Sequence, residues 1–282
     1  MGNPVRLFYF CDMNKVLVSL ASRLFPRWVV NRAYDQLTNP QIRKLREHEE
    51  EVLDQAQKSR LSFRGFDIQL YQWGQGPRKV LLVHGWEGQA GNFADVILEL
   101  LKRDFLVYAF DAPSHGYSSR GPASLFLFGD LVGELMEAYQ VDQVISHSFG
   151  GVATTYALSQ RPDFTLSHYL LFTVPDRFMD YAEDTARRFG MTESVKDQLL
   201  ERVRKETGAD PYSLAVSNFV QDVAVNQVLI LHDEADRVIP FEKARTVAEA
   251  WPQARIEGVQ DTGHFRILRT QSVIERGLDF LG

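Results

Sequence analysis

The segment DQVISHSFGGVA, residues 142–153, runs from an apolar strand into Ser148 and then into the start of a helix. This order is typical of a nucleophile elbow, usually written G-x-S-x-G, in which a strained turn exposes the serine hydroxyl and requires small neighbours. Gly150 satisfies the pattern two residues after the serine. Ser146 stands in the place of the first glycine, and serine is still small enough for the turn. The alternative interpretation is that Ser148 only caps the helix as a short polar residue.

Similar apolar runs recur on both sides of this segment, and amphipathic helical patterns separate them. Nearly continuous hydrophobicity is typical of strands in a parallel sheet that is buried on both faces. Strands alternating with helices predict an α/β fold with right-handed crossovers and a mostly parallel central sheet. The expected strands are 66–73, 79–85, 105–112, 142–148, 168–174 and 226–233, and the expected helices lie in 93–101, 125–139, 241–251 and 273–281.

One connection is much longer than a simple crossover requires. Between the strand ending near Val174 and the strand starting near Asn226 lie 51 residues, 175–225, with helical patterns at 181–189 and 194–205. Connections inside compact domains are usually far shorter. We therefore predict a helical cap inserted into a core of residues 61–282. Caps of this kind shape a pocket and exclude water.

Residues 1–60 precede this core and are predicted to form an N-terminal helical extension. One helical face within it is expected to pack on the body of the protein, with contact to a membrane surface or a partner as the alternative. A second, highly charged stretch at 41–60 predicts a mostly solvated helix in which His48 is a surface residue. The apolar face consists of Val16, Leu17, Leu20, Leu24 and Trp28.

The N-terminal sequence predicts neither a membrane-spanning helix nor secretion. Its longest uncharged stretch, residues 16–22, is much shorter than the roughly 20 residues that a spanning helix needs. Asp12 is poorly placed for a signal peptide, although Ser19-Leu20-Ala21 imitates a cleavage site. We therefore expect a cytoplasmic protein. Cys11 is the only cysteine, which excludes an intrachain disulfide and is compatible with a reducing compartment.

The composition excludes several classes of protein. Lys and Arg number 31 and Asp and Glu number 37, so the formal net charge is −6, while 45% of residues are hydrophobic. These values are typical of a soluble globular chain and not of a disordered or collagen-like one. A mildly acidic chain without a long basic run gives no reason to expect a nucleic acid partner.

Candidate catalytic partners for Ser148 follow the later strands, because ligands of open parallel sheets bind beyond the carboxyl ends of the strands. A serine hydroxyl needs an imidazole base, and the imidazole needs an orienting carboxylate. Asp236 and His264 come after the serine in the order serine, acid, histidine that the elbow pattern predicts. Asp233 is a second candidate for the acid. Asp236 is favoured, since it lies four residues before Pro240, and Asp233 is expected to stabilise the turn.

The negative charge of a tetrahedral intermediate needs preorganised donors. The N–H group of Phe149 lies at the predicted start of a helix, where the helix dipole favours negative charge. The second donor is expected in the loop after the first buried strand, and we assign it to Trp86. The other histidines are interpreted as structural, with His147 lining the pocket or packing beneath it. These further histidines are His115, His168 and His232.

Taken together, these residues make the sequence resemble the α/β-hydrolase superfamily, in its serine esterase- and lipase-like branch. The landmarks occur in order over residues 62–282: HGW at 84–86, DAPSHGYSS at 111–119, SHSFGG at 146–151, HDEADRVIP at 232–240 and TGHF at 262–265. Ser114 replaces a glycine that is usual in the second landmark. A serine nucleophile distinguishes the chain from relatives that use an aspartate, such as haloalkane dehalogenases and epoxide hydrolases.

The resemblance implies a catalytic triad and an oxyanion hole, with neither a metal ion nor an organic cofactor. It implies hydrolysis of a carboxylic ester or related acyl bond in a small molecule through an acyl-enzyme. Phe149, Trp86 and the predicted cap suggest an apolar acyl or aromatic substrate. A thioesterase or a C–C bond hydrolase with the same triad is an alternative, and a non-catalytic ligand-binding homologue is another. The triad is Ser148, Asp236 and His264, and the oxyanion-hole amides are those of Trp86 and Phe149.

Overall fold

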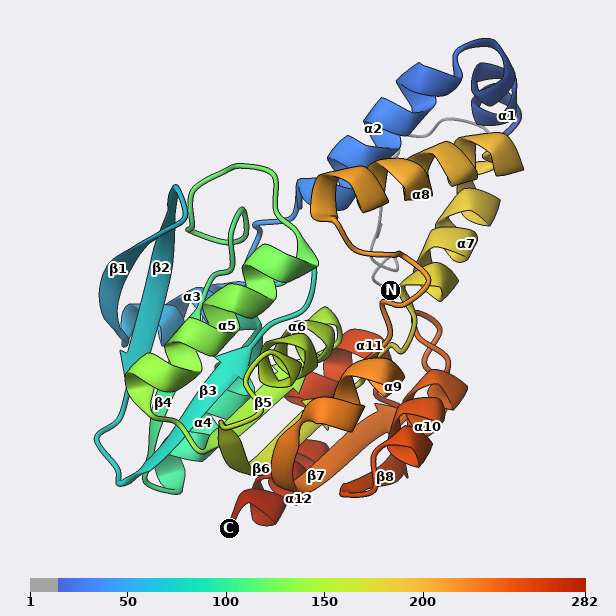
Figure 1. Ribbon diagram of the computed structural model, residues 1–282. Helices are drawn as coiled ribbons and strands as arrows, with labels where there is room; N and C mark the ends of the chain where they lie inside the picture. Colours follow the sequence, from blue (N-terminus) through green and yellow to red (C-terminus); the bar gives the residue numbers. More distant parts are fainter. Residues whose placement is uncertain (1–14) are drawn as a thin grey trace. The chain divides into compact units, whose positions relative to one another are not determined.

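A computed structural model describes residues 15–282 and contains a single eight-stranded sheet with the order β1-β2-β4-β3-β5-β6-β7-β8 (Figure 1). β1 and β2 are antiparallel, β2 is antiparallel to β4, and the remaining pairs are parallel. The predicted α/β-hydrolase fold with a mostly parallel sheet is therefore confirmed. The strands are β1 (Gln57–Phe63), β2 (Phe66–Trp73), β3 (Arg78–Val83), β4 (Phe105–Phe110), β5 (Gln143–His147), β6 (Thr165–Phe172), β7 (Ala224–Asp233) and β8 (Ala254–Val259).

The two edge strands, β1 and β8, were not predicted, and β1 is polar. β1 is exposed along most of its length and pairs with β2 through a tight turn in which Arg64 and Gly65 have φ of 47° and 86°. Two consecutive positive φ values suit a two-residue hairpin. The helix expected at 41–60 is consequently shorter: α3 spans Glu47–Asp54, and β1 already begins at Gln57. His48 in α3 is partly exposed, as expected, with Nε2 3.1 Å from an Asp95 carboxylate oxygen.

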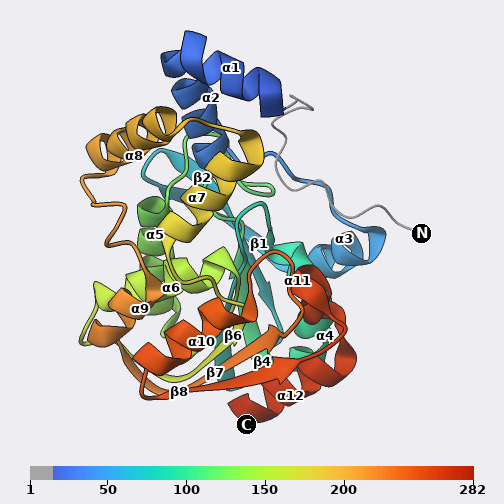
Figure 2. The same ribbon diagram turned by 90° about the vertical axis from the view of Figure 1, so that its right-hand side faces the viewer.

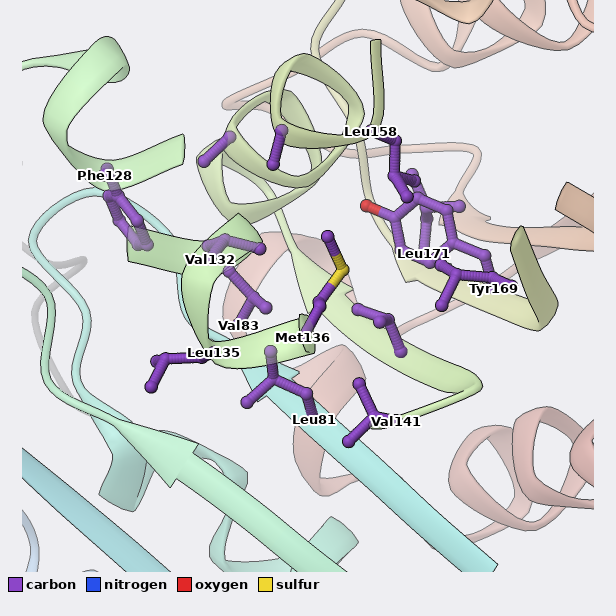
Figure 3. Packing of buried hydrophobic residues seen from close by; sticks show 14 of the residues in the cluster. Leu81, Val83, Phe128, Val132, Leu135, Met136, Val141, Leu158, Tyr169 and Leu171 are labelled. Carbon is purple, nitrogen blue, oxygen red and sulfur yellow. The ribbon is translucent and has the colours of Figure 1, made fainter. Parts of the chain in front are cut away.

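The sheet is buried on both faces, which accounts for the nearly continuous apolar strands. In β3, Leu81 and Val83 belong to one hydrophobic cluster, and the alternate residues Val80 and Leu82 belong to another. Figure 3 shows the first cluster, with side chains of α5 packed beside those of β3. The helices that belong with the sheet are α3, α4 (Ala94–Lys102), α5 (Leu125–Tyr139), α6 (Phe149–Ser159), α9 (Val216–Phe219), α10 (Phe241–Ala250), α11 (Gly263–Arg266) and α12 (Gln271–Leu281), with short 3₁₀ turns at Ala90–Phe93, Val220–Asp222 and Ile267–Arg269.

The chain divides into two compact units. The larger one, Thr38–Asp176 with Ala215–Gly282, contains the sheet, and the smaller one combines the N-terminal residues through Leu37 with Arg177–Leu214. In the smaller unit, helices from distant parts of the sequence pack together around Val18, Val29 and Val195 (Figure 2). Its helices are α1 (Lys15–Leu24), α2 (Pro26–Thr38), α7 (Phe178–Phe189) and α8 (Glu193–Thr207). The division into a 1–60 extension and a 61–282 core with a 175–225 cap stays a prediction.

The predicted apolar face near the N-terminus is divided between two helices. α1 ends at Leu24 and α2 starts at Pro26, because proline suits the first position of a helix. The inward positions are Val18 and Val29, whereas the predicted residues Leu17, Leu20, Leu24 and Trp28 are exposed. That face therefore does not pack on the protein as expected. Cys11 lies outside the described residues. Within residues 15–282, no helix is both long and apolar enough to cross a bilayer.

Candidate active site

Ser148 occupies the turn between β5 and α6 in a strained conformation, with φ 54° and ψ −122°. Its N–H donates to the carbonyl oxygens of Phe172 (3.1 Å) and Thr173 (2.9 Å), which fixes the turn against the end of β6. The Ser148 side chain makes no capping hydrogen bond to the helix. The N-cap interpretation therefore fails, and a non-glycine residue held at positive φ is instead the backbone strain that functional sites collect.

Small residues flank the serine for two different reasons. A Cβ atom on Gly150 would lie 2.2 Å from the carbonyl oxygen of Val83, so only glycine fits there. Ser146 is buried, and its hydroxyl is 2.9 Å from the hydroxyl of Tyr169. The departure from the glycine pattern thus places a hydrogen-bonding group beneath the turn without crowding it.

His264, in the first turn of α11, and Asp236, in the loop after β7, are brought together at the carboxyl ends of the strands. Nδ1 of His264 lies 2.9 Å from Oδ2 of Asp236, and both side chains are almost completely buried. Because a carboxylate only accepts hydrogen bonds, Nδ1 carries the proton, and Nε2 of the neutral imidazole presents a lone pair. This is the tautomer that a general base needs.

The carboxylate of Asp236 is kept ionised by the donors around it. Oδ1 accepts the N–H groups of Val238 (2.7 Å) and Ile239 (3.0 Å). Burial raises the pKa of Asp236, but the His264 hydrogen bond and these two backbone donors outweigh burial, so the net pKa is lowered. Asp236 is therefore negative at neutral pH and can stabilise a positively charged His264.

Asp233, the second candidate acid, has a different set of partners. Its Oδ2 accepts hydrogen bonds from Thr262 N (2.6 Å), Thr262 Oγ1 (2.8 Å) and Gly263 N (2.7 Å), and Oδ1 accepts the N–H of Ala235 (2.8 Å). It contacts the loop that precedes His264, and no hydrogen bond joins it to the imidazole. Asp236, and not Asp233, is therefore the carboxylate that contacts the imidazole.

His147 connects the serine turn to the base, a link that the sequence did not predict. Its Nε2–H donates to the backbone carbonyl of His264 at 2.8 Å, and the two rings lie 5.0 Å apart. Burial, followed by the proximity of His264, lowers the pKa of His147 to about 3, so it stays neutral. His232 contacts the acid: its Nε2 atom lies 3.5 Å from Asp236 Oδ2 and donates a hydrogen bond to the carbonyl oxygen of Ile239. Among residues 15–282, Ser148 Oγ forms no hydrogen bond. The hydrogen bond between a catalytic nucleophile and its base is often long without substrate and tightens when substrate binds.

The two expected oxyanion-hole residues lie next to one another. The rings of Trp86 and Phe149 meet edge to face at 5.3 Å. Phe149 is the first residue of α6, where N–H groups have no acceptor inside the helix, and the N–H of Trp86 has no acceptor in the described part of the chain. A Cβ atom on Gly85 would lie 3.2 Å from Ser148 Cβ, so the backbone before Trp86 passes close to the serine.

Glu87, the residue after Trp86, is a further site residue that the motifs did not indicate. Its Oε2 accepts the N–H groups of Gln41 (2.7 Å) and Ile42 (2.6 Å), and its own φ is 58°. Burial raises the pKa of Glu87, and these two hydrogen bonds partly offset the rise. The two contacts join residues 46 and 45 positions apart in the sequence, so no local pattern could have revealed them. They fasten residues preceding α3 to the loop that carries the Trp86 amide.

We expect Glu87→Ala to lower the free energy of unfolding by about 1–3 kcal/mol, because two backbone donors lose their acceptor. Glu87→Gln should lose less than half as much, since both donors bind one oxygen and an amide oxygen can replace it. Urea unfolding of both variants measures the difference. Equal destabilisation by alanine and glutamine would contradict this role.

The DAPSHGYSS motif has a structural role beside the site. Asp111 is buried and accepts hydrogen bonds from Ala90 N (2.9 Å), Tyr117 N (2.8 Å) and the Tyr71 hydroxyl (2.9 Å). His115 is also buried, and Nδ1 donates to the carbonyl of Pro113 at 3.0 Å. Both residues therefore hold loops in place. His168, half-buried near the other end of the sheet, packs on Phe280.

Comparison with known proteins shows the family and the fold of this chain. The family model described as "Alpha/beta hydrolase family" matches residues 80–276. A Drosophila melanogaster protein named "Probable serine hydrolase" is 35% identical over 96 residues, which are 31% of this chain and only 29% of that protein.

Solved structures share the fold at low sequence identity. An esterase of Pyrococcus furiosus has a TM-score of 0.61 and 16% identity, covering 87% of this chain and 97% of its own. A membrane phospholipase A described as a bacterial virulence factor has a TM-score of 0.64 and 14% identity, covering 94% of this chain and 95% of its own. At these identities the similarity concerns the fold alone.

Proposed function

Since this chain belongs to the alpha/beta hydrolase family, we propose that it is a serine hydrolase that cleaves a carboxylic ester through an acyl-enzyme. The observation that carries the proposal is the 2.9 Å contact between His264 Nδ1 and Asp236, which gives the imidazole the tautomer of a general base. The strained Ser148 turn, joined to His264 through His147, supplies the nucleophile. Esterase and phospholipase activities of proteins that share the fold are consistent with an ester substrate.

In the first half-reaction, Ser148 Oγ attacks the carbonyl carbon of the ester while His264 Nε2 accepts the hydroxyl proton. The carbonyl oxygen becomes an oxyanion and receives hydrogen bonds from the N–H groups of Trp86 and Phe149. Collapse of this intermediate breaks the bond to the alcohol oxygen. His264 returns its proton to that oxygen, and the alcohol leaves behind an ester of Ser148.

In the second half-reaction, water attacks the carbonyl carbon of the acyl-enzyme. His264 removes a proton from the water, and the same two N–H groups stabilise the second oxyanion. Collapse releases the carboxylic acid, and Ser148 Oγ regains the proton from His264. Asp236 stays ionised throughout and stabilises the imidazolium, in keeping with its lowered pKa.

The substrate we propose is a small ester with an apolar acyl group. Trp86 and Phe149 place two aromatic rings beside the oxyanion-hole amides, and both rings also lie near other aromatic side chains. An apolar wall next to the reacting carbonyl favours an apolar acyl chain over a charged one.

The expected result is turnover of short p-nitrophenyl acyl esters and covalent labelling by a fluorophosphonate, with the mass increase on the peptide that contains Ser148. Parallel assays with acyl thioesters of the same chain lengths test whether the oxygen ester is preferred. A protein inert to the whole panel and to the probe would contradict the proposal. Labelling of Ser148 with a preference for thioesters would keep the serine hydrolase and correct the substrate.

A further inference from the structure

The exposed apolar side chains of this protein are concentrated in one short segment. Eight large hydrophobic residues in the described part of the chain are exposed, and five of them fall within residues 17–28. Their exposed fractions lie between 51% and 64%. Single exposed hydrophobic residues are ordinary, but a contiguous group marks an interaction surface. We call this group the apolar patch: Leu17, Leu20, Leu24, Phe25 and Trp28.

The patch is a second apolar face on helices that already have a buried one. Leu17, Leu20 and Leu24 follow the i, i+3, i+7 spacing of one side of α1, while Val18 on another side is buried against α8 residues such as Val195. Folding of the smaller unit therefore leaves the patch uncovered. Phe25 and Trp28 continue it through the helix break into the first turn of α2.

The two helices that carry the patch are basic, whereas the chain is acidic; α8 of the same unit places Asp197, Glu201 and Glu206 in a pocket with Arg27. Residues 15–38 contain four basic residues and one acidic residue, a net charge of +3, whereas the whole chain carries −6. The remainder of the chain therefore carries −9. Arg23, Arg27 and Arg32 are exposed between and beside the patch residues, and no ion pair engages them among the described residues.

We propose that the apolar patch binds the surface of an anionic lipid bilayer. Helices that lie in a membrane interface combine leucine and aromatic residues on one side with arginine or lysine at the boundary. Tryptophan favours the headgroup region, and each cationic side chain near an anionic surface strengthens binding. The contact we propose is one of surface association, and within residues 15–282 no helix is long and apolar enough to span a bilayer.

A second copy of the chain fits this surface less well. A symmetric dimer through the patch would place the same arginines of two copies against one another. The acidic remainder of a neighbouring copy would offer complementary charge but little apolar surface. Only three large hydrophobic residues outside the patch are exposed among the described residues, and of these only Tyr212 belongs to the unit that carries the patch. A bilayer supplies both the negative charge and the apolar layer.

The test is co-sedimentation of the full chain with vesicles of phosphatidylcholine alone and of phosphatidylcholine with one-third phosphatidylglycerol. We expect binding to the mixed vesicles that weakens as salt is raised. Leu20→Glu with Leu24→Glu should weaken it tenfold or more, because two charges enter the apolar contact. Tyr212→Glu, which charges an exposed aromatic residue outside the patch, should leave binding unchanged.

Two variants, each of which reverses one positive charge, test the electrostatic contribution to vesicle binding. Arg23→Glu should weaken binding to the mixed vesicles by about tenfold or more. Lys44→Glu changes the net charge equally at an exposed position of the other unit and should have little effect. Trp73 and Trp251 are buried, and Trp86 is partly buried in the other unit, so Trp28 is the exposed tryptophan of the described residues. A blue shift of tryptophan emission on vesicle binding should therefore be lost in Trp28→Phe.

Turnover of a short soluble ester should be the same in all these variants, since none of them alters the proposed catalytic residues. This separates the lipid proposal from the proposed function, because vesicle binding is measured without any reaction. No binding of the wild-type protein to either vesicle, or binding that survives the double leucine substitution, would overturn the proposal. A dimer in solution that the leucine substitutions dissociate would assign the patch to a second copy instead.

Discussion

Ser148→Ala is expected to lower kcat/KM for a short acyl ester by roughly 10⁴-fold or more, because the acyl-enzyme can no longer form. The free energy of unfolding should change little or increase. The Ser148 hydroxyl makes no capping hydrogen bond, so its loss leaves no buried group unpaired. The Ser148 turn is held by its backbone, through the N–H bonds to the carbonyls of Phe172 and Thr173, and alanine retains them.

Ser146→Ala is the matched control for this substitution. It removes a hydroxyl two residues away, on the same strand and turn, where Ser146 is buried against Tyr169. We expect a loss of about 0.5–1.5 kcal/mol in unfolding free energy and a change of kcat/KM within a few-fold. Esterase kinetics, fluorophosphonate labelling and urea unfolding of both variants measure the contrast. An active Ser148→Ala protein would contradict the assignment of Ser148 as the nucleophile. Equal losses of activity in the two variants would mean that the substitutions act by disturbing the turn and not by removing a nucleophile.

The central strands were predictable because burial on both faces leaves a simple signal. Residues 80–83 of β3 alternate between two hydrophobic clusters, so these four positions are all apolar and the run is continuous. The edge strand β1 has no such signal, since it is exposed on most of its length and owes its place to the Arg64-Gly65 turn. Its polar residues are indistinguishable from those of a solvated helix until the partner strand is known.

The candidate site was predictable where each residue follows a recognisable strand, and not where contacts join distant loops. Ser148 and Trp86 come directly after apolar runs, so position alone singles them out. The contact from His147 to the His264 carbonyl, and that from Glu87 to Gln41 and Ile42, exist only after folding. His147 and Glu87 each lie beside a motif residue but are not part of its pattern, so nothing in the neighbouring sequence indicates their contacts.

Asp236→Asn provides the strongest test of the acid, because a neighbouring carboxylate serves as its control. The asparagine carbonyl can still accept the N–H groups of Val238 and Ile239, so the turn should keep its shape. Its NH₂ group would then face His264 Nδ1 and force the imidazole into the opposite tautomer. With Nε2 protonated, His264 cannot accept the Ser148 proton, and we expect kcat/KM to fall by roughly 10⁴-fold.

Asp233→Asn should show the reverse pattern. Both Asp233 oxygens are occupied by donors, so an amide in either orientation loses at least one hydrogen bond, at a cost of about 1–3 kcal/mol in unfolding free energy. His264 follows the Thr262-Gly263 loop that Asp233 holds, and activity should fall far less than in Asp236→Asn. Urea unfolding and ester kinetics on both variants decide between the two acids. A larger catalytic loss in Asp233→Asn, with Asp236→Asn mainly destabilised, would reverse the assignment, because only the residue that sets the His264 tautomer can affect proton transfer without affecting the fold.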